Sequence, residues 1–141
     1  MCESTDWREL IPHRGAMSLL HEIVAYDATT IHATAVSHQQ MSNPLRSDGR
    51  LRAVHLCEYG AQAMAVHGGL LARDAGLDAM PGLLVALRAV QLNVVRIDDL
   101  PDELHVYATR LLDGGSSWQY AFRVEHAARV VASGRAAVMR R

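Results

Sequence analysis

The sequence contains no lysine, two cysteines and one phenylalanine among its 141 residues. The two cysteines, Cys2 and Cys57, suggest neither a disulfide framework nor a metal site, so a reducing, cytoplasmic setting is expected. The formal net charge of -1 lacks the basic excess that is typical of proteins binding nucleic acid or membrane surfaces. No apolar run approaches the roughly 18 residues that span a bilayer, and no secretion signal is visible. Neither nucleic acid nor a membrane is therefore an expected partner.

Apolar residues, in contrast, are plentiful. They make up 50% of the chain, which allows one sizeable core without metal or disulfide support. No internal repeat, low-complexity tract or charge block divides the sequence. A single domain over residues 1–141 is expected.

Six segments have the composition of β-strands. The clearest follows the turn signal DGGS, because apolar and polar residues alternate from Trp118 to Glu125. The other predicted strands cover residues 21–26, 30–36, 83–95, 103–112 and 129–139. Most of them follow one another through short connections, as in an antiparallel meander.

The segment 51–73 is predicted to form one long helix. It lacks proline and is apolar nearly all round, so other structure must wrap it. Ser47 or Asp48 is expected to supply the N-cap, and the pair Gly68-Gly69 to weaken the end of the helix.

The order is then two strands, one buried helix and four strands. A curved antiparallel sheet around one central helix satisfies these demands, which is the α+β hotdog architecture. Pairing two such sheets edge to edge would hide the remaining apolar surface, so a dimer is expected.

Three polar side chains interrupt the apolar helix. His55, Glu58 and Gln62 fall within about 60° of one another on its circumference and form a narrow stripe. A carboxylate in apolar surroundings tends to have a raised pKa, which suits a general acid or base, with Gln62 fixing its orientation. The alternative is that Glu58 caps unpaired backbone N–H groups in the loop 37–50. His67 lies on another side of the helix.

The same helix carries a family resemblance. EYGAQ, residues 58–62, resembles the Glu-x-x-Ala-Gln signature of (3R)-hydroxyacyl-[acyl-carrier-protein] dehydratases. LIPHRGAMSLLHEIVAYD and PGLLVALRAVQLNVV are similar to the amino-terminal segment and the long strand of that family. Asn43-Pro44, Asp48-Gly49 and residues 58–69 resemble, in order, a branch found with aryl-polyene and related polyketide-like clusters. The resemblance covers almost the entire chain.

The resemblance implies a hotdog dimer with active sites at the subunit interface. The substrate would be a 3-hydroxyacyl thioester on the phosphopantetheine of an acyl carrier protein, dehydrated to a trans-2-enoyl thioester in fatty-acid or polyene-type biosynthesis. A histidine of one subunit would remove the α-proton, while Glu58 of the other assists departure of the hydroxyl. Backbone N–H groups near the helix start, at Gly49 and Leu51, would polarise the thioester carbonyl. No metal or redox cofactor is implied.

One part of the family pattern is missing. The catalytic histidine is expected fourteen residues before Glu58, where this chain has Pro44. Three interpretations follow: His55 replaces it; His38 or His13 swings in; or the chain is a partner subunit that completes or stabilises a catalytic dehydratase, or a carrier-binding module. An acyl thioesterase, in which the helix carboxylate activates water, is a further alternative.

Arg46, Arg50 and Arg52 cluster before the helix. They are predicted to dock the acidic surface or phosphate of the carrier protein, with an ordinary solvated basic face as the alternative. The sequence leaves open the acyl chain length, which depends on packing around Met64 and Leu83, the choice between carrier protein and coenzyme A, and homodimer versus heterodimer.

Overall fold

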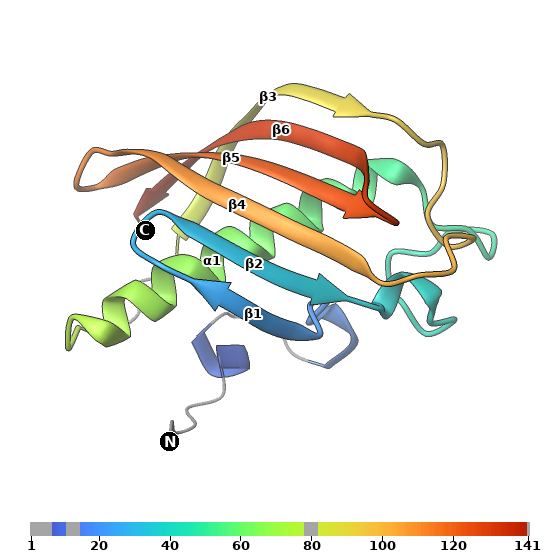
Figure 1. The fold of residues 1–141 in the computed structure, drawn as a ribbon, viewed down its shortest axis with the longest axis horizontal. Helices are drawn as coiled ribbons and strands as arrows, with labels where there is room; N and C mark the ends of the chain where they lie inside the picture. Colours follow the sequence, from blue (N-terminus) through green and yellow to red (C-terminus); the bar gives the residue numbers. More distant parts are fainter. Residues whose placement is uncertain (1–6, 11–14, 78–81, 141) are drawn as a thin grey trace.

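The computed structural model describes residues 7–10, 15–77 and 82–140, in which a six-stranded antiparallel sheet curves around one long helix (Figure 1). The helix is α1 (Leu56–Asp74). The strands are β1 (Glu22–Tyr26), β2 (Thr30–Ala35), β3 (Gly82–Leu92), β4 (Leu104–Asp113), β5 (Ser117–His126) and β6 (Arg129–Arg140). Their order in the sheet is β1-β2-β4-β5-β6-β3. The predicted hotdog architecture is confirmed.

Short 3₁₀ helices complete the described chain. They are η1 (Trp7–Leu10), η2 (Gly15–Met17), η3 (Ser37–Gln39) and η4 (Ala53–His55). The strands agree closely with the predicted segments, and the largest difference is that β3 ends at Leu92 rather than Val95. Within the described ranges, no helix combines the length and hydropathy that a bilayer span requires.

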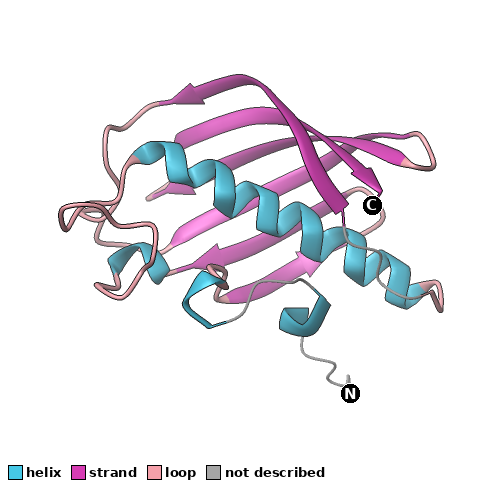
Figure 2. Cartoon of the chain, turned by 180° about the vertical axis from the view of Figure 1, so that it is seen from behind, coloured by secondary structure: helices cyan, strands magenta, loops and turns pink. Residues whose placement is uncertain are grey.

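The core lies between α1 and the concave face of the sheet (Figure 2). Residues of α1 in this core are Leu56, Tyr59, Ala63, Val66 and Leu70, and the sheet contributes Ile31, Ala33, Leu104, Val106, Tyr120, Phe122, Val124 and Ala132, all buried. The sheet side chains alternate along each strand, as the period of two requires. Burial of α1 on this side explains why its sequence is so apolar.

The phenylalanine Phe122 sits where α1 comes close to the sheet. A Cβ atom at Gly60 of α1 would lie 2.7 Å from its Cδ2, and one at Gly134 of β6 would lie 2.9 Å from its Cε1. Glycine is unfavourable inside a helix by about 0.5–1 kcal/mol, so its presence at Gly60 has a packing reason. The ring takes the space that two side chains would need.

The predicted helix start is wrong. Asp48 and Gly49, with φ of 55° and 73°, instead form a tight turn closed by hydrogen bonds from Ser47 N to Arg50 O (2.8 Å) and from Arg50 N to Ser47 O (2.9 Å). Asp-Gly is a preferred pair where both central residues need positive φ. Asp48 therefore lies inside this turn, and no helix begins directly after it that it could cap.

The helix begins only after η4, with His55 in the N-cap position and no side-chain cap. It then continues through Gly68-Gly69 to Asp74, so the glycine pair does not end it. Packing of α1 against the sheet outweighs the weak helix propensity of glycine, as tertiary contacts often do.

Candidate active site

His55 and Glu58 lie together at the amino-terminal end of α1. Glu58 is in the first turn, and both side chains are half-buried. A spacing of three residues places them as neighbours on one side of the helix. A carboxylate in the first turn also interacts favourably with the positive end of the helix dipole. Two groups able to exchange protons therefore remain partly accessible at this end.

Gln62 faces a different environment. It is fully buried, its Oε1 accepts a hydrogen bond from Leu19 N (2.9 Å), and its Nε2 donates to Met17 O (2.7 Å). These bonds fasten the segment before β1 to the helix. The predicted stripe thus divides into a half-buried pair and a buried clamp, and the role of Gln62 in orienting Glu58 stays a prediction.

The side of α1 that carries Glu58 continues with small residues. Ala61, Ala65 and Gly68 follow it at helical spacing, and all three are only half-buried. All other residues of α1 from Leu56 to Leu70, in contrast, are buried. Glu58 therefore stands at one end of the less covered side of α1.

Where the family pattern places its histidine, this chain has the dipeptide Asn43-Pro44. Pro44 is exposed, and the preceding Asn43 is buried. The Nδ2 of Asn43 donates to Ser37 O (3.0 Å) and Tyr59 Oη (3.3 Å), and its Oδ1 accepts from Leu45 N (2.9 Å). This position holds the loop in place and offers no proton acceptor of histidine type.

Tyr59, inside the EYGAQ segment, extends this bracing. Because the amide of Asn43 donates to its oxygen, the Tyr59 hydroxyl is free to donate to Ser37 Oγ (2.8 Å), which in turn donates to Leu19 O (2.9 Å). Burial raises the pKa of Tyr59, which keeps this donor protonated. This role was not predicted from the sequence, although a lone tyrosine in an apolar helix is a signal for it.

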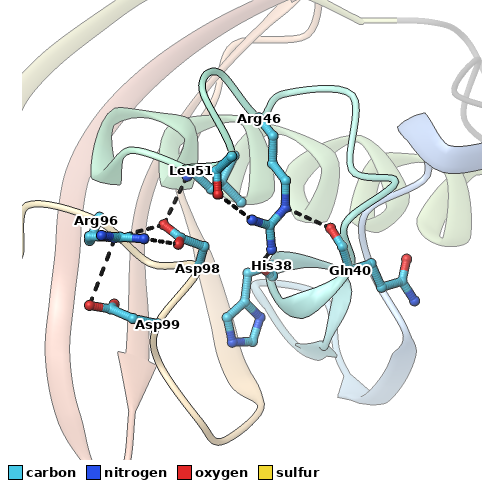
Figure 3. Close-up of polar contacts among 8 residues, drawn as sticks. His38, Gln40, Arg46, Leu51, Arg96, Asp98 and Asp99 are labelled. Carbon is cyan, nitrogen blue, oxygen red and sulfur yellow. Dashed lines mark hydrogen bonds and ion pairs between the residues drawn. The ribbon is translucent and has the colours of Figure 1, made fainter.

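Arg46 is a loop clamp (Figure 3). Its guanidinium donates to three backbone carbonyls, those of Gln40 (2.8 Å from Nε), Gly49 (2.7 Å from Nη1) and His38 (3.2 Å from Nη2). These contacts hold the loop before α1 in one shape. Arg50 and Arg52 are exposed, and the docking role predicted for all three arginines stays a prediction.

The backbone of Leu51 is tied to the loop after β3 (Figure 3). Its N–H donates to Asp98 Oδ1 (2.9 Å), which also accepts from Arg96 Nε (3.0 Å), while Arg96 Nη2 donates to Asp98 Oδ2. The hydrogen bonds from Arg96 hold the pKa of Asp98 well below its usual range. The N–H of Leu51, expected to contact the thioester, is thus engaged within the chain. The substrate contact predicted at Gly49 stays a prediction.

The ring of His38 is fixed in the protein interior. Its Nε2 lies 3.1 Å from both Leu100 O and Asp102 O, and the residue is fully buried. Carbonyl oxygens only accept, so Nε2 carries the proton. Burial lowers the pKa of His38, which favours this neutral form. A base that swings toward Glu58 would have to break these bonds; His13 lies outside the described residues.

His67 is also fully buried and takes part in a directed chain of hydrogen bonds. Its Nε2 donates to Asp27 O (2.8 Å), so its Nδ1 accepts from the Tyr120 hydroxyl (2.7 Å), whose oxygen accepts from Arg110 Nε (3.2 Å). Burial lowers the pKa of His67 as well. This histidine connects α1 to the turn between β1 and β2 and to the sheet.

A family model agrees with this fold and this helix. The model of the ApeP-like dehydratases, described as ApeP dehydratase, matches residues 5–141. The chain belongs to the ApeP-like dehydratase family. No curated protein matches it by sequence.

Solved structures match this ApeP-like chain as well. The dehydratase heterocomplex ApeI:P from Xenorhabdus doucetiae matches with a TM-score of 0.86 and 21% identity, over 99% of this chain and 93% of the other. A hypothetical thioesterase with coenzyme A from Streptococcus pneumoniae matches with a TM-score of 0.63 and 12% identity, over 85% and 84%. The Escherichia coli PaaI protein matches with a TM-score of 0.62 and 17% identity, over 89% and 85%. At these identities the likeness establishes the shared fold.

In this member of the ApeP-like family, the titratable side chains near α1 therefore differ in how accessible they are. A half-buried carboxyl, Glu58, stands on the less covered side of α1, while His38 and His67 are both buried and bonded to backbone carbonyls. In the described residues, no group of three or more histidine, cysteine, aspartate or glutamate side chains could hold a metal ion. His55 is the described histidine that shares the helix end with Glu58.

Proposed function

We propose that the chain is one subunit of a heteromeric hotdog dehydratase, in which Glu58 supplies the acid and a partner subunit supplies the histidine base. The substrate is a 3-hydroxyacyl thioester on the phosphopantetheine of an acyl carrier protein, in fatty-acid or polyene-type biosynthesis. The observation that carries the proposal is the loop before α1, where the expected histidine is replaced by Asn43-Pro44 and Asn43 is committed to bracing. The scarcity of cysteine supports a cytoplasmic setting.

The reaction divides between the two subunits. The partner's histidine removes a proton from C2 of the thioester, the C3–O bond breaks, and protonated Glu58 donates a proton to the departing hydroxyl, which leaves as water. The double bond forms between C2 and C3. Transfer of a proton from the imidazolium to the Glu58 carboxylate restores both groups. The positive end of α1 lies beside this chemistry and favours the negative charge that develops on the thioester oxygen.

The similarity to a solved heterocomplex supports a mixed assembly. ApeI:P is a dehydratase heterocomplex, and this chain matches it over nearly its full length. In a mixed dimer, one composite site combines Glu58 with the partner's histidine. The opposite site lacks a histidine from this chain, so a single working site per heterodimer is expected.

A second candidate is a dehydratase that works without a different partner. The position of His55 favours it, because this half-buried histidine neighbours Glu58 on one helix. Its weakness is geometric, since two groups on one helix side must reach opposite ends of the C2–C3 bond.

The test is an absorbance assay of enoyl thioester formation from a 3-hydroxyacyl thioester. The chain alone should give no product, and the chain mixed with a histidine-containing hotdog dehydratase of the same cluster should give product. In the mixture, Glu58→Gln should lower turnover at least 100-fold, because the general acid is lost. His55→Ala should leave it within about twofold.

The matched control is Glu22→Gln, the same chemical change on an exposed residue of β1. It should leave turnover unchanged. Product from the chain alone that disappears in His55→Ala would favour the second candidate. Full activity of the Glu58→Gln mixture would remove the proposed acid.

Carrier docking is tested separately at Arg50 and Arg52, the two exposed arginines of the predicted cluster. Changing both to glutamate should weaken turnover of the carrier-bound substrate and spare a small soluble thioester. Equal losses on both substrates would rule out docking there.

A further inference from the structure

The edge strand β3 (Gly82–Leu92) has the features of a subunit contact. Within the described residues it pairs with β6 on one side only and borders the sheet (Figure 1). Leu84, Leu87, Val90 and Leu92 are each 38–40% exposed. A long apolar edge invites another strand, and natural proteins rarely leave one open.

The convex side of this edge carries concentrated positive charge. Arg88 of β3 lies directly opposite Arg135 of β6, and both are exposed. Neither strand contains an aspartate or a glutamate. Arg88 donates a long hydrogen bond to the neutral Gln119 (3.4 Å). Like charges directly opposite one another destabilise a sheet, so a negative charge placed beside this pair would be stabilising.

Pairing with a second copy of this chain would make the repulsion worse. Arg88 lies next to Leu87, the midpoint of β3. If two copies paired antiparallel along the whole strand, the two Arg88 side chains would be direct or diagonal cross-strand neighbours, with Cβ atoms about 4.5–8 Å apart. Arg135 of each copy would lie beside them, so four guanidinium groups would share one row.

We propose that Arg88 and Arg135 select the partner subunit: they oppose pairing of two copies through β3 and favour a hotdog subunit that carries a carboxylate on the convex side of its own edge strand. The inference rests on the proposed heteromeric function. It names the feature by which that partner is recognised. An acidic side chain next to Arg88 would turn the unfavourable Arg88–Arg135 pair into a charge-balanced row.

Partner selection by Arg88 and Arg135 can be tested with variants of this chain alone. A double variant, Arg88→Glu with Arg135→Glu, is mixed with the wild type, and association is measured by sedimentation at low salt. The mixed pair should associate at least tenfold more tightly than either protein alone, because arginines then face glutamates. In 1 M NaCl, where the screening length is about 3 Å, this preference should largely disappear.

The control is Arg129→Glu, an exposed residue on β6 outside the stretch that pairs with β3. Mixing it with the wild type should give no preference. If the double glutamate variant does not fold, Arg88→Gln with Arg135→Gln replaces it and should self-associate more tightly than the wild type. The selection rule would be overturned if neither double variant changed the strength of association. It would also be overturned if the wild type formed a homodimer whose stability did not depend on Arg88 and Arg135.

These outcomes are separate from those of the dehydration assay. The association measurement involves neither substrate nor Glu58, so it can fail while the composite site stands. Conversely, product formed by the chain alone would remove the heteromeric function even if charge pairing were observed.

Discussion

The polar residues of α1 fall into two groups with different surroundings. His55 and Glu58, at the start of the helix, are half-buried, whereas Gln62 and His67 are fully buried and hydrogen-bonded to backbone atoms. A buried polar group stabilises a fold only when its partners are present, so the second pair is committed to structure. The first pair keeps access to a substrate or a neighbouring subunit. Polarity alone does not separate these roles, whereas the degree of burial does.

The largest effect expected from this contrast is at the clamp residue. Gln62→Leu keeps the approximate size but leaves Leu19 N–H and Met17 C=O without partners, so it should cost about 2–4 kcal/mol in the free energy of unfolding. Glu58→Gln should cost less than about 1 kcal/mol, because a carboxylate in the first turn of a helix gains only about 0.3–1 kcal/mol from the helix dipole. Urea denaturation of both variants measures the difference. Equal losses would mean that the two groups do not differ as described.

A second contrast lies between Gly60, which faces the sheet, and Gly68, on the less covered side of α1. Gly60 faces the Phe122 ring, and its Cβ would be only 2.7 Å away, so Gly60→Ala should destabilise by about 1–3 kcal/mol despite the better helix propensity of alanine. Adding Phe122→Leu should recover part of the loss, because the smaller side chain gives way. Thermal unfolding of the single and double variants measures the coupling. Additive losses would show that the close approach is not the cause.

The sheet and the buried helix were predictable because their signals are periodic. Alternation from Trp118 to Glu125 and the all-round apolar segment ending near Arg73 both reflect burial that repeats along an element. The first residue of α1 was not predictable in the same way. Asp48-Gly49 satisfies the requirements of a turn as well as of a cap. In the structure the next segment is held by Asp98, which accepts a hydrogen bond from Leu51 N, and such a contact between distant segments is not visible in the sequence.

The candidate site was predictable in part for a similar reason. Glu58 and the missing histidine follow from the resemblance to a family motif and its spacing. The bracing by Asn43, Arg46 and Tyr59 depends on loop carbonyls and hydroxyls that meet only in three dimensions. For this reason Arg46 looked like a surface charge in the sequence and is a clamp in the structure.

Low pH should lower the free energy of unfolding through the two buried histidines, His38 and His67. Burial lowers the pKa of His38 and His67 in the folded chain, so both stay neutral there while the unfolded chain takes up protons below about pH 6.5. The contribution of these two histidines to the free energy of unfolding is thus constant above that pH and falls below it, down to their folded-state pKa values. Each histidine contributes at most about 1.4 kcal/mol per pH unit. Urea midpoints at pH 8.0, 6.5 and 5.5 check the direction, and His67→Phe should flatten the slope.

The smallest expected effect concerns the less covered side of α1. A Cβ at Gly68 would meet nothing within 4 Å, and the position is half-buried. Gly68→Ala should therefore stabilise the isolated chain by about 0.5–1 kcal/mol, through helix propensity alone. Thermal unfolding of the isolated chain measures the gain, with Gly60→Ala as the matched change on the covered side. A loss of stability at Gly68 would mean that this side is covered in the protein, and the distinction between the two sides of the helix would no longer hold. A gain in the isolated chain, combined with weaker assembly with the partner, would instead indicate that the partner packs along this side of α1.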